Sequence, residues 1–453
     1  MRRSIILYLL TLLTILSCKK EKTNATTSIS VLEIYSDSLF KSSLDSTTIA
    51  GGTILVHQKG ETLLKKSYGL ASLELEVPMP ENAIFEIGSV TKQFTAVAIL
   101  KLVEAGKLAF EDDFTKYLDY DTKGRKVTID QLLNHTSGIA SYTEIEEFGS
   151  LVPQDLPRDT LLRILETKDF LFEPGEALIY NNSAYFILGL IIEKVTEKTY
   201  EEYLKEIIFN PLGMNNTYYC STSKVLKNKA YGYDYTPEGL NQKQYLNHAW
   251  PYAAGSLCST TEDLLIWMKA IHAGKLLSTE QYQELITPKN LNNGTPIRYA
   301  MGLAHLNNYG NEEISHGGGI PGFLTQTNYF PEQDLYIISI TNTAGPHGGN
   351  FFVDNLMWKL LEKKDHESLT LDFDPKEIEG SYVGQTRGRM QSIDVKAITD
   401  AITVESNNNG NIDTLNTYIG NHTWMDGNTT ISIKDGLLET DQVYGHYLLK
   451  KKE

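Results

Sequence analysis

Cysteine is scarce in this chain of 453 residues, which contains only Cys18, Cys220 and Cys258. So small a number excludes a fold that depends on many disulfides. Two alternatives stay open for Cys220 and Cys258: a single bridge formed in an oxidising compartment, or two small buried side chains. No cluster of residues with metal-ligand spacing is visible, so we expect neither a metal nor another cofactor.

Basic residues are also few, with 41 Lys and Arg against 57 Asp and Glu, which gives a formal net charge of −16. Nucleic-acid binding depends on cationic side chains that neutralise phosphates, so we expect no nucleic-acid partner. Apolar residues make up 41% of the chain, which is enough for a sizeable core. The length allows two or three domains, or one large domain with an appendage.

The apolar run at the N-terminus, Ile5–Leu16, is too short to span a bilayer as a helix. It follows Arg2 and Arg3 and ends in "ILSC", which resembles the lipobox of bacterial lipoproteins. This resemblance implies a signal peptide over residues 1–17, a lipid anchor at Cys18 and a place in the bacterial cell envelope, facing the periplasm or the surface. The alternative is an ordinary signal peptide with a chance cysteine.

The spacing of apolar residues changes character along the rest of the chain. The expected elements, in order, are a polar tether (18–27), a helix (28–46), a β-hairpin (51–71), a helix (89–106), a mostly helical region (110–290), strands (from 297) and a final helix (from 351). Strands at both ends with helices between them predict one domain, residues 28–365. Its antiparallel sheet would be built from both ends of the segment and flanked by helices, with a helical lobe inserted.

Residues 376–453 differ from what precedes them, because they consist of short segments that alternate apolar and polar residues. The pairs Asn409-Gly410 and Asp435-Gly436 are typical of tight hairpin turns. We therefore predict a small, separate antiparallel β domain at the C-terminus. With the larger domain, this gives an α+β protein.

Short motifs that could carry chemistry occur more than once, so their context matters. The pattern S-x-x-K begins at four positions, Ser17, Ser38, Ser89 and Ser221. Only Ser89 follows a strand and loop and opens a long apolar helix. Ser89 and Lys92 would share one face of that helix, near unpaired backbone N–H groups. The alternative is a serine that merely caps the helix.

Two further segments combine polar side chains with glycine or helix-start signals. Tyr180 and Asn182 lie in "FEPGEALIYNNSAYFILG", between a Pro-Gly turn and an apolar helix that Asn182 could also cap. His316 is followed by "GGGIPGF", where glycines would let a substrate approach the backbone closely.

Five segments occur in the order found in serine β-lactamase-related proteins: "GSVTKQFTA", "LLNHTSGI", "FEPGEALIYNNSAYFILG", "AAGSLCSTTEDLLIW" and "HGGGIPGF". This family includes class C β-lactamases, DD-peptidases, D-amino-acid peptidases and certain esterases. The resemblance covers about residues 30 to 365. It implies a β-lactamase/transpeptidase-like fold, with the active site between the sheet and the helical lobe.

The resemblance also implies roles for individual residues. Ser89 would be the acylated nucleophile, Lys92 would accept its proton, and Tyr180 would handle the proton of the leaving group. Asn182 would hydrogen-bond the substrate or the lysine. The backbone N–H groups of Ser89 and Gly319 would form the oxyanion hole.

One departure from the family concerns the segment that often reads Lys-Thr-Gly and binds a substrate carboxylate. Here it reads His316-Gly317-Gly318, so the hydroxyl is missing and the fixed cation is replaced by an imidazole. We expect His316 and Gly318 to contact substrate, and His316 to titrate near its ordinary pKa. Carboxylate-bearing substrates would then improve as the pH falls towards 6. Asn134 and His135 are interpreted as residues that fix a loop rather than as catalysts.

The expected function is that of a serine hydrolase acting on a peptide, amide or ester, possible substrates being D-amino-acid or peptidoglycan-derived peptides. The missing Lys-Thr-Gly segment argues against an efficient β-lactamase. The alternatives are a β-lactamase, or a penicillin-binding sensor or scaffold that acylates slowly and turns over poorly.

Overall fold

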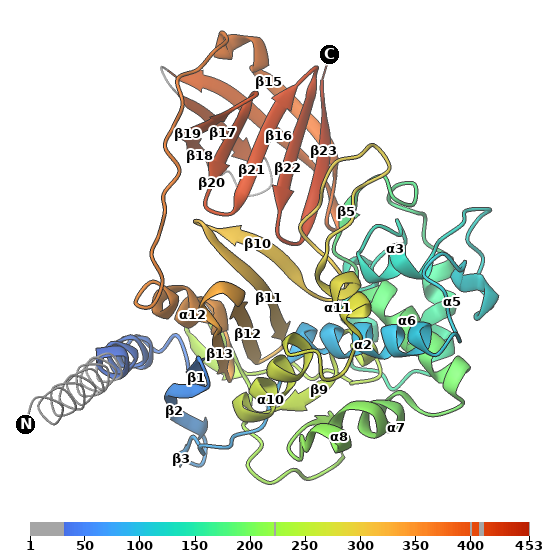
Figure 1. Ribbon diagram of the computed structural model, residues 1–453, viewed down its shortest axis with the longest axis vertical. Coiled ribbons are helices and arrows are strands. Elements are labelled where there is room, and N and C mark those ends of the chain that lie inside the picture. The colour runs from blue at the N-terminus through green and yellow to red at the C-terminus, as the bar shows by residue number, and fades with distance from the viewer. Residues whose placement is uncertain (1–30, 222, 399–400, 407–411, 453) are drawn as a thin grey trace, which may run out of the picture.

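The computed structural model describes residues 31–221, 223–398, 401–406 and 412–452 (Figure 1). Four predictions concern residues that lie outside the described ones: the signal peptide (1–17), the tether (18–27), lipidation of Cys18 and the turn at Asn409-Gly410. In the described part of the chain, residues 31–45 form the first helix.

The larger domain is organised around an antiparallel sheet of seven strands in the described residues, in the order β10-β11-β12-β13-β1-β2-β3. The strands are β1 (Gly51–Gln58), β2 (Glu61–Ser72), β3 (Val77–Pro78), β10 (Ala304–Asn308), β11 (Asn311–Ile320), β12 (Phe323–Phe330) and β13 (Leu335–Thr341). β1 pairs with β13, so strands from the two ends of the segment meet in the middle of one sheet. The predicted fold class is confirmed.

Both faces of this sheet are buried, each under its own hydrophobic core. Successive side chains of β1 point alternately into these two cores. Ile54 and Val56 pack with the first helix and with α12 (Gly349–Met357). Leu55 points to the opposite face, where it joins the main core formed with the helical lobe.

The inserted helical lobe occupies the region between β3 and β10 (Figure 1). Its helices are α2 (Thr91–Glu104), α3 (Ile129–Leu133), α4 (Phe148–Leu151), α5 (Arg158–Glu166), α6 (Asn182–Thr196), α7 (Tyr200–Leu204), α8 (Asn210–Leu212), α9 (Tyr252–Gly255), α10 (Thr261–His272) and α11 (Thr279–Ile286). Short strands lie among them: β4 (Phe85–Glu86), β5 (Leu178–Ile179), β6 (Tyr218–Tyr219), β7 (Tyr233–Thr236), β8 (Gly239–Gln242) and β9 (Leu257–Ser259), with β14 (Thr343–Ala344) after β13. α2 and α6 are buried in the main core over most of their length because most of their residues are apolar.

The C-terminal domain is a barrel-like antiparallel β structure (Figure 1). Its strands are β15 (Gly380–Thr386), β16 (Arg389–Ile398), β17 (Ala401–Ser406), β18 (Ile412–Leu415), β19 (Thr417–Gly420), β20 (Thr423–Asp426), β21 (Thr429–Lys434), β22 (Leu437–Gln442) and β23 (Gly445–Lys451). It has its own core around Trp424 and Tyr382. The turn between β21 and β22 has positive φ at both Asp435 and Gly436, as the sequence pattern predicted.

The two domains share hydrogen bonds. β23 pairs antiparallel with β5 of the larger domain, and in Figure 1 the ends of β22 and β23 reach the region of β5. Arg298 strengthens this junction: its Nε donates to Asp441 Oδ2 over 2.6 Å, and it also bonds to the Asn428 carbonyl. The C-terminal domain is therefore held against the part of the chain that leads directly into Tyr180.

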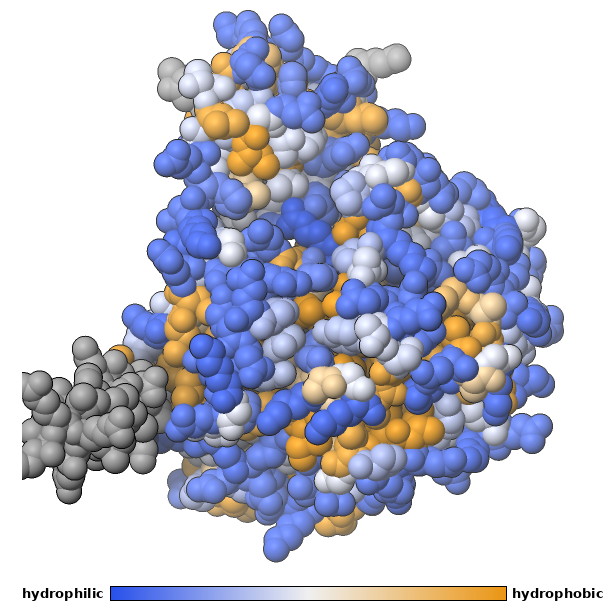
Figure 2. All heavy atoms as spheres, in the orientation of Figure 1, coloured by the Kyte–Doolittle hydropathy of each residue, from blue (hydrophilic) through white to orange (hydrophobic). Residues whose placement is uncertain are grey.

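The visible surface is mainly hydrophilic, as expected for a chain with a formal net charge of −16 (Figure 2). Figure 2 shows hydrophobic residues gathered over the lower, helical part of the larger domain and in smaller areas on the C-terminal domain. Among the described residues, no helix combines the length and the apolar character needed to cross a bilayer.

Candidate active site

Ser89 lies in a single 3-10 turn, Gly88–Val90, between β4 and α2. The regular helix begins at Thr91, two residues later than the sequence pattern suggested. The residues in the N-cap positions of the two helical segments are Ile87 and Val90. Ser89 is therefore not a helix cap, and its half-buried side chain is available for chemistry.

Glycines on both sides allow the backbone of this turn to lie in direct contact with the backbone at the end of β11. Gly88 has a φ of 52°, and a Cβ there would lie 2.9 Å from the Gly319 nitrogen. A Cβ on Gly318 would lie 2.0 Å from the Ile87 carbonyl oxygen. No side chain fits at Gly318 without moving the backbone, so the glycines of this segment position Ser89 as well as facing the pocket.

Lys92 is fully buried one turn after Ser89. Its Nζ lies 3.3 Å from Ser89 Oγ, 2.7 Å from Asn182 Oδ1 and 2.8 Å from the Ala254 carbonyl oxygen. Burial, with a smaller contribution from the positive charge of Arg387, lowers the pKa of Lys92 well below its usual value. A neutral amine at this position can donate two hydrogen bonds to the two carbonyl-type oxygens and direct its lone pair to the serine hydroxyl.

Tyr180 follows β5 and is buried beside the lysine, with Lys92 Nζ 4.7 Å from the centre of its ring. Burial raises the pKa of the phenol above its usual value, and the neighbouring Ser89 hydroxyl opposes that rise. The phenol is therefore protonated at neutral pH and can act as a proton donor next to Ser89.

Asn182 is the first residue of α6, and the helix cap is its neighbour Asn181, whose side chain accepts from the Ala184 N–H over 2.9 Å. The suggestion that Asn182 caps the helix is therefore wrong by one residue. Because the cap is supplied elsewhere, the Asn182 amide is free to bridge Lys92 and Thr143, to which its Nδ2 donates over 3.2 Å.

His135 and Asn134 lie behind the site. The Asn181 N–H donates to His135 Nδ1 over 3.2 Å, and the His135 ring lies 4.4 Å from the Tyr180 ring between centres. Asn134 Oδ1 accepts from Thr136 within its own loop. His135 therefore stabilises the segment that carries Tyr180, Asn134 stabilises its own loop, and neither borders the two pockets at Ser89.

His316 differs from expectation. Its ring is fully buried, and burial, with a smaller effect of Lys92, lowers its pKa to about 3. Nδ1 faces the Gly317 carbonyl and must donate to it, so Nε2 accepts from the Tyr299 hydroxyl at 2.9 Å. Both ring nitrogens are thus engaged within the protein. The expectation that His316 titrates near neutral pH is wrong, because a charged imidazolium would be desolvated here. His316 does border a pocket beside Ser89, but as a neutral ring with both nitrogens engaged it supplies no cation to a substrate carboxylate.

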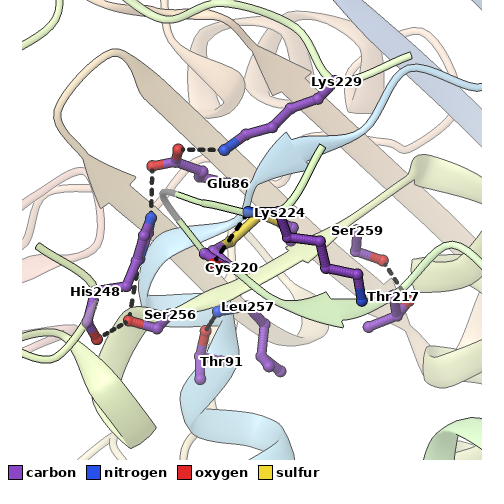
Figure 3. Close-up of a disulfide and its surroundings, with 12 residues drawn as sticks. Glu86, Thr91, Thr217, Cys220, Lys224, Lys229, His248, Ser256, Leu257 and Ser259 are labelled. Carbon is purple, nitrogen blue, oxygen red and sulfur yellow. Dashed lines mark hydrogen bonds and ion pairs between the residues drawn. A yellow bond between two sulfur atoms is a disulfide. The ribbon is translucent and has the colours of Figure 1, made fainter. Parts of the chain in front are cut away.

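Strand β9 stabilises both sides of the serine turn. The Ile87 N–H donates to the Leu257 carbonyl over 2.9 Å, and the Leu257 N–H donates to Thr91 Oγ1 over 3.1 Å. A disulfide between Cys220 and Cys258 attaches β9 to the segment after β6 (Figure 3). The alternative that the sequence left open is thereby decided in favour of a bridge.

Glu86, the last residue of β4, is almost completely buried near this disulfide (Figure 3). Lys229 and Lys243 lie 3.1 and 2.6 Å from its carboxylate, and His248 lies 3.6 Å away. Burial opposes ionisation, but the hydrogen bond from His248 and the positive charges of the two lysines hold the pKa of Glu86 below its usual value. The residue that leads into the serine turn is thus anchored by charge as well as by strand pairing.

Two pockets meet at Ser89. One, of about 190 Å³, is mainly apolar and is lined by residues that include Phe148, Val152, Leu246 and Trp250. The other, of about 410 Å³, is bordered by Tyr180, Gly317, Gly318, Gln326, Asn350, Arg387 and Tyr444, and is called the polar pocket after the polar residues among them. Ser89, Thr143, Asn182 and Gly319 border both. A substrate whose scissile bond lies at Ser89 would therefore have one part in the mainly apolar pocket and the other part in the polar pocket.

Arg387 and Tyr444 were not among the predicted site residues. They belong to the turns after β15 and β22 of the C-terminal domain. Tyr444 accepts a hydrogen bond from the Gly317 N–H at 2.9 Å, and the Arg387 guanidinium lies 5.0 Å from the centre of the Tyr180 ring. Their sequence contexts, "GQTRGRM" and "DQVYGHY", look like ordinary hairpin turns.

No group of three or more His, Cys, Asp or Glu side chains in the described ranges is arranged to hold a metal ion. The polar groups around Ser89 include Lys92, Tyr180 and Asn182. These are groups suited to acyl transfer through a nucleophilic serine.

The fold and the site together define a serine hydrolase of the β-lactamase-related class. A family model described as Beta-lactamase matches residues 37–361, and the chain belongs to this family. Penicillin-binding protein 4* of Bacillus subtilis is 32% identical over 310 residues, which cover 64% of this chain and 68% of that protein. Protein flp of Staphylococcus aureus is 29% identical over 315 residues, 68% of this chain, and the match spans 62% of the length of flp.

Solved structures extend the similarity beyond the larger domain. The octameric penicillin-binding protein homologue from Pyrococcus abyssi superposes with a TM-score of 0.64 at 25% identity, covering 92% of this chain and 99% of that one. The D-amino acid amidase from Ochrobactrum anthropi SV3, with a TM-score of 0.64 at 21% identity, covers 73% of this chain and 98% of its own. The second likeness concerns the fold alone.

Proposed function

We propose that this protein hydrolyses an amide or ester bond through an acyl-enzyme on Ser89. The observation that carries this proposal is the environment of Lys92. Its two shortest contacts are to oxygens that only accept hydrogen bonds, and its third is to the serine hydroxyl. A buried amine with a lowered pKa, oriented in this way, can act as a general base for Ser89.

In the proposed mechanism, the proton of Ser89 passes to Lys92 as Oγ bonds to the substrate carbonyl carbon. Backbone N–H groups of Ser89 and Gly319 hold the resulting oxyanion. Tyr180 gives its proton to the leaving nitrogen or oxygen as that bond breaks, and it is reprotonated from Lys92. Water then hydrolyses the ester on Ser89, with the same groups moving protons in reverse.

Amides and short peptides are the substrate class that we propose first. Penicillin-binding relatives and a D-amino acid amidase share this fold, so D-amino-acid amides and D-Ala-D-Ala peptides belong in the first panel. The absence of a lysine and a threonine in the His316-Gly317-Gly318 segment argues against an efficient β-lactamase. Slow acylation without turnover is the outcome that would favour a penicillin-binding sensor.

The test is labelling with a fluorophosphonate, followed by the panel of activated esters, D-amino-acid amides, D-Ala-D-Ala peptides and a chromogenic cephalosporin. We expect one label on the peptide that contains Ser89, and no label in Ser89→Ala. Ser221→Ala is the matched control, because Ser221 begins another S-x-x-K sequence and lies away from the pocket. Persistent labelling of Ser89→Ala would refute the proposal.

We also propose that the protein is an exported lipoprotein anchored through Cys18. The disulfide between Cys220 and Cys258 supports export to an oxidising compartment. Full-length protein should partition into detergent, and Cys18→Ala should not. A mature N-terminus well beyond residue 18 would contradict a lipid anchor.

A further inference from the structure

The polar pocket beside Ser89 lacks the lysine and the threonine that a Lys-Thr-Gly segment would supply for binding a carboxylate, because this chain has His316-Gly317-Gly318 there. Gly317 has no hydroxyl, and its N–H donates to the Tyr444 hydroxyl. His316 is neutral, with both nitrogens bonded inside the protein. Lys92 uses its N–H groups on Asn182 and Ala254. The larger domain therefore contributes no charged donor to this pocket that is available to a substrate.

The C-terminal domain brings a cation to the same pocket. Arg387 lies in the turn between β15 and β16 and borders the cavity together with Ser89, Tyr180 and Gly317. Only its Nε is bonded in the described part of the chain, donating to Glu144 Oε1 over 2.9 Å. Its side chain is 42% exposed. The two terminal nitrogens of the guanidinium, which form the planar fork that fits a carboxylate, thus remain accessible from the pocket.

The local chain geometry fits this position. Gly388 has a φ of 73°, and a Cβ there would lie 2.3 Å from Glu144 Oε2. A side chain at 388 would displace the carboxylate that orients Arg387. The turn is therefore shaped so that Glu144 can hold one edge of the guanidinium while the other edge faces away from it.

We propose that Arg387 is a specificity-determining residue that binds a free carboxylate on the leaving-group side of the substrate. This inference rests on the proposed function. The side is assigned from Tyr180, the proton donor to the leaving group, which borders the polar pocket with Arg387. The acyl side then faces the apolar pocket around Phe148 and Trp250. The substrate class is a short peptide, amide or ester with an apolar acyl part and an anionic leaving group.

A competing explanation is that Arg387 only attaches the C-terminal domain to Glu144. The two explanations differ for Glu144→Gln, which removes the ion pair and leaves the arginine in place. If Arg387 serves attachment alone, Glu144→Gln should behave like Arg387→Ala. If Arg387 binds substrate, Glu144→Gln should keep the preference for a carboxylate or increase it, because a competing carboxylate has been removed.

The experiment compares two aryl esters of phenylacetylglycine, one with 3-hydroxybenzoate and one with 3-hydroxybenzamide as leaving group. Both form the same acyl-enzyme, so the ratio of their kcat/KM values reports recognition of the leaving group. We expect the wild-type protein to favour the benzoate by about 10- to 100-fold, the scale of a hydrogen-bonded charge pair. Arg387→Ala should remove this preference and bring the ratio of kcat/KM values close to one. Arg389→Ala lies in the same hairpin but outside the pocket lining, and it should keep the preference.

Three outcomes would overturn the inference: no preference in the wild type, an unchanged ratio in Arg387→Ala, or an equal loss in Glu144→Gln. If both esters are hydrolysed through Ser89 without preference, only this inference fails and the proposed function stands. If no turnover depends on Ser89, the proposed function fails. Calorimetric binding of free 3-hydroxybenzoate and 3-hydroxybenzamide to Ser89→Ala then tests Arg387 by itself, and equal affinities would overturn its role.

Discussion

The residues around Ser89 fall into two groups that are held in different ways. Lys92, Tyr180 and Asn182 come from helices and strand ends inside the larger domain and are buried or half-buried. Arg387 and Tyr444 come from hairpin turns of the C-terminal domain. The inner group is fixed by core packing and backbone contact, and the outer group by a few hydrogen bonds across the domain junction.

This difference suggests a division of labour. Proton transfer needs atoms placed within a fraction of an ångström, which a packed core provides. Recognition of one side of a substrate tolerates groups carried on turns, and turns accept changes in sequence more readily than cores do. Substitutions in the two groups should therefore have effects of different kind and size.

The largest effects are expected in the inner group. Lys92→Ala and Tyr180→Phe should each lower the rate of acylation about 10²- to 10⁴-fold, the usual scale for a lost acid–base group. Stopped-flow labelling with a fluorophosphonate and single-turnover hydrolysis of an activated ester measure this. A near-normal rate in either variant would assign its role to another residue.

The next effect tests backbone contact. Gly318→Ala places a methyl group against the Ile87 carbonyl and should shift the serine turn, reducing acylation on the order of 10²-fold. Gly319→Ala provides a graded comparison, because its Cβ would meet only the Leu324 side chain, at 3.4 Å. The loss in Gly319→Ala should be smaller. Equal losses would show that close packing at Gly318 is not what positions Ser89.

A structural effect should follow from opening the disulfide. Cys220→Ser with Cys258→Ser removes a link that spans 38 positions and should lower the free energy of unfolding by about 2–4 kcal/mol. Thermal unfolding with and without a reducing agent measures this. Because β9 contacts both sides of the serine turn, we expect activity to decline at a lower temperature as well. An unchanged melting temperature would contradict this view of β9.

The smallest effect concerns pH. Lys92 acts as a base only when neutral, so acylation should fall as the pH drops through its lowered pKa. Arg387 contributes to that lowering through its positive charge. In Arg387→Ala the pKa of Lys92 should rise, and the acidic limb of the pH–rate profile should move to higher pH. Arg389→Ala should leave the limb in place. A profile of kcat/KM for a neutral ester distinguishes these results, and an unmoved limb in Arg387→Ala would mean that its charge is screened from Lys92.

His316 shows how context changes a residue that the sequence singles out. Its position in the chain resembles that of a substrate-binding lysine, but its two ring nitrogens are hydrogen-bonded to the Tyr299 hydroxyl and the Gly317 carbonyl. His316 is therefore not expected to improve the binding of carboxylates near pH 6. With a pKa of about 3, the imidazole stays neutral throughout that range.

The sequence by itself determined the architecture of the larger domain and the location of its candidate nucleophile. Alternating strands at both ends of the segment, the apolar helix after Ser89 and the one-turn spacing to Lys92 are local patterns, and local patterns follow from backbone geometry. The cap of α6 was misplaced by one residue because Asn181 and Asn182 are equally good capping residues.

Only the tertiary structure decided which residues complete the pocket. Arg387 and Tyr444 stand in hairpin turns whose sequences are typical of any β domain, and nothing local connects them with Ser89. They reach the site because β23 pairs with β5 and Arg298 bonds to Asp441 of β22 and to the Asn428 carbonyl. The pairing of the two cysteines and the lowered pKa values of Lys92 and His316 were decided in the same way, since burial and long-range contact depend on the folded chain as a whole.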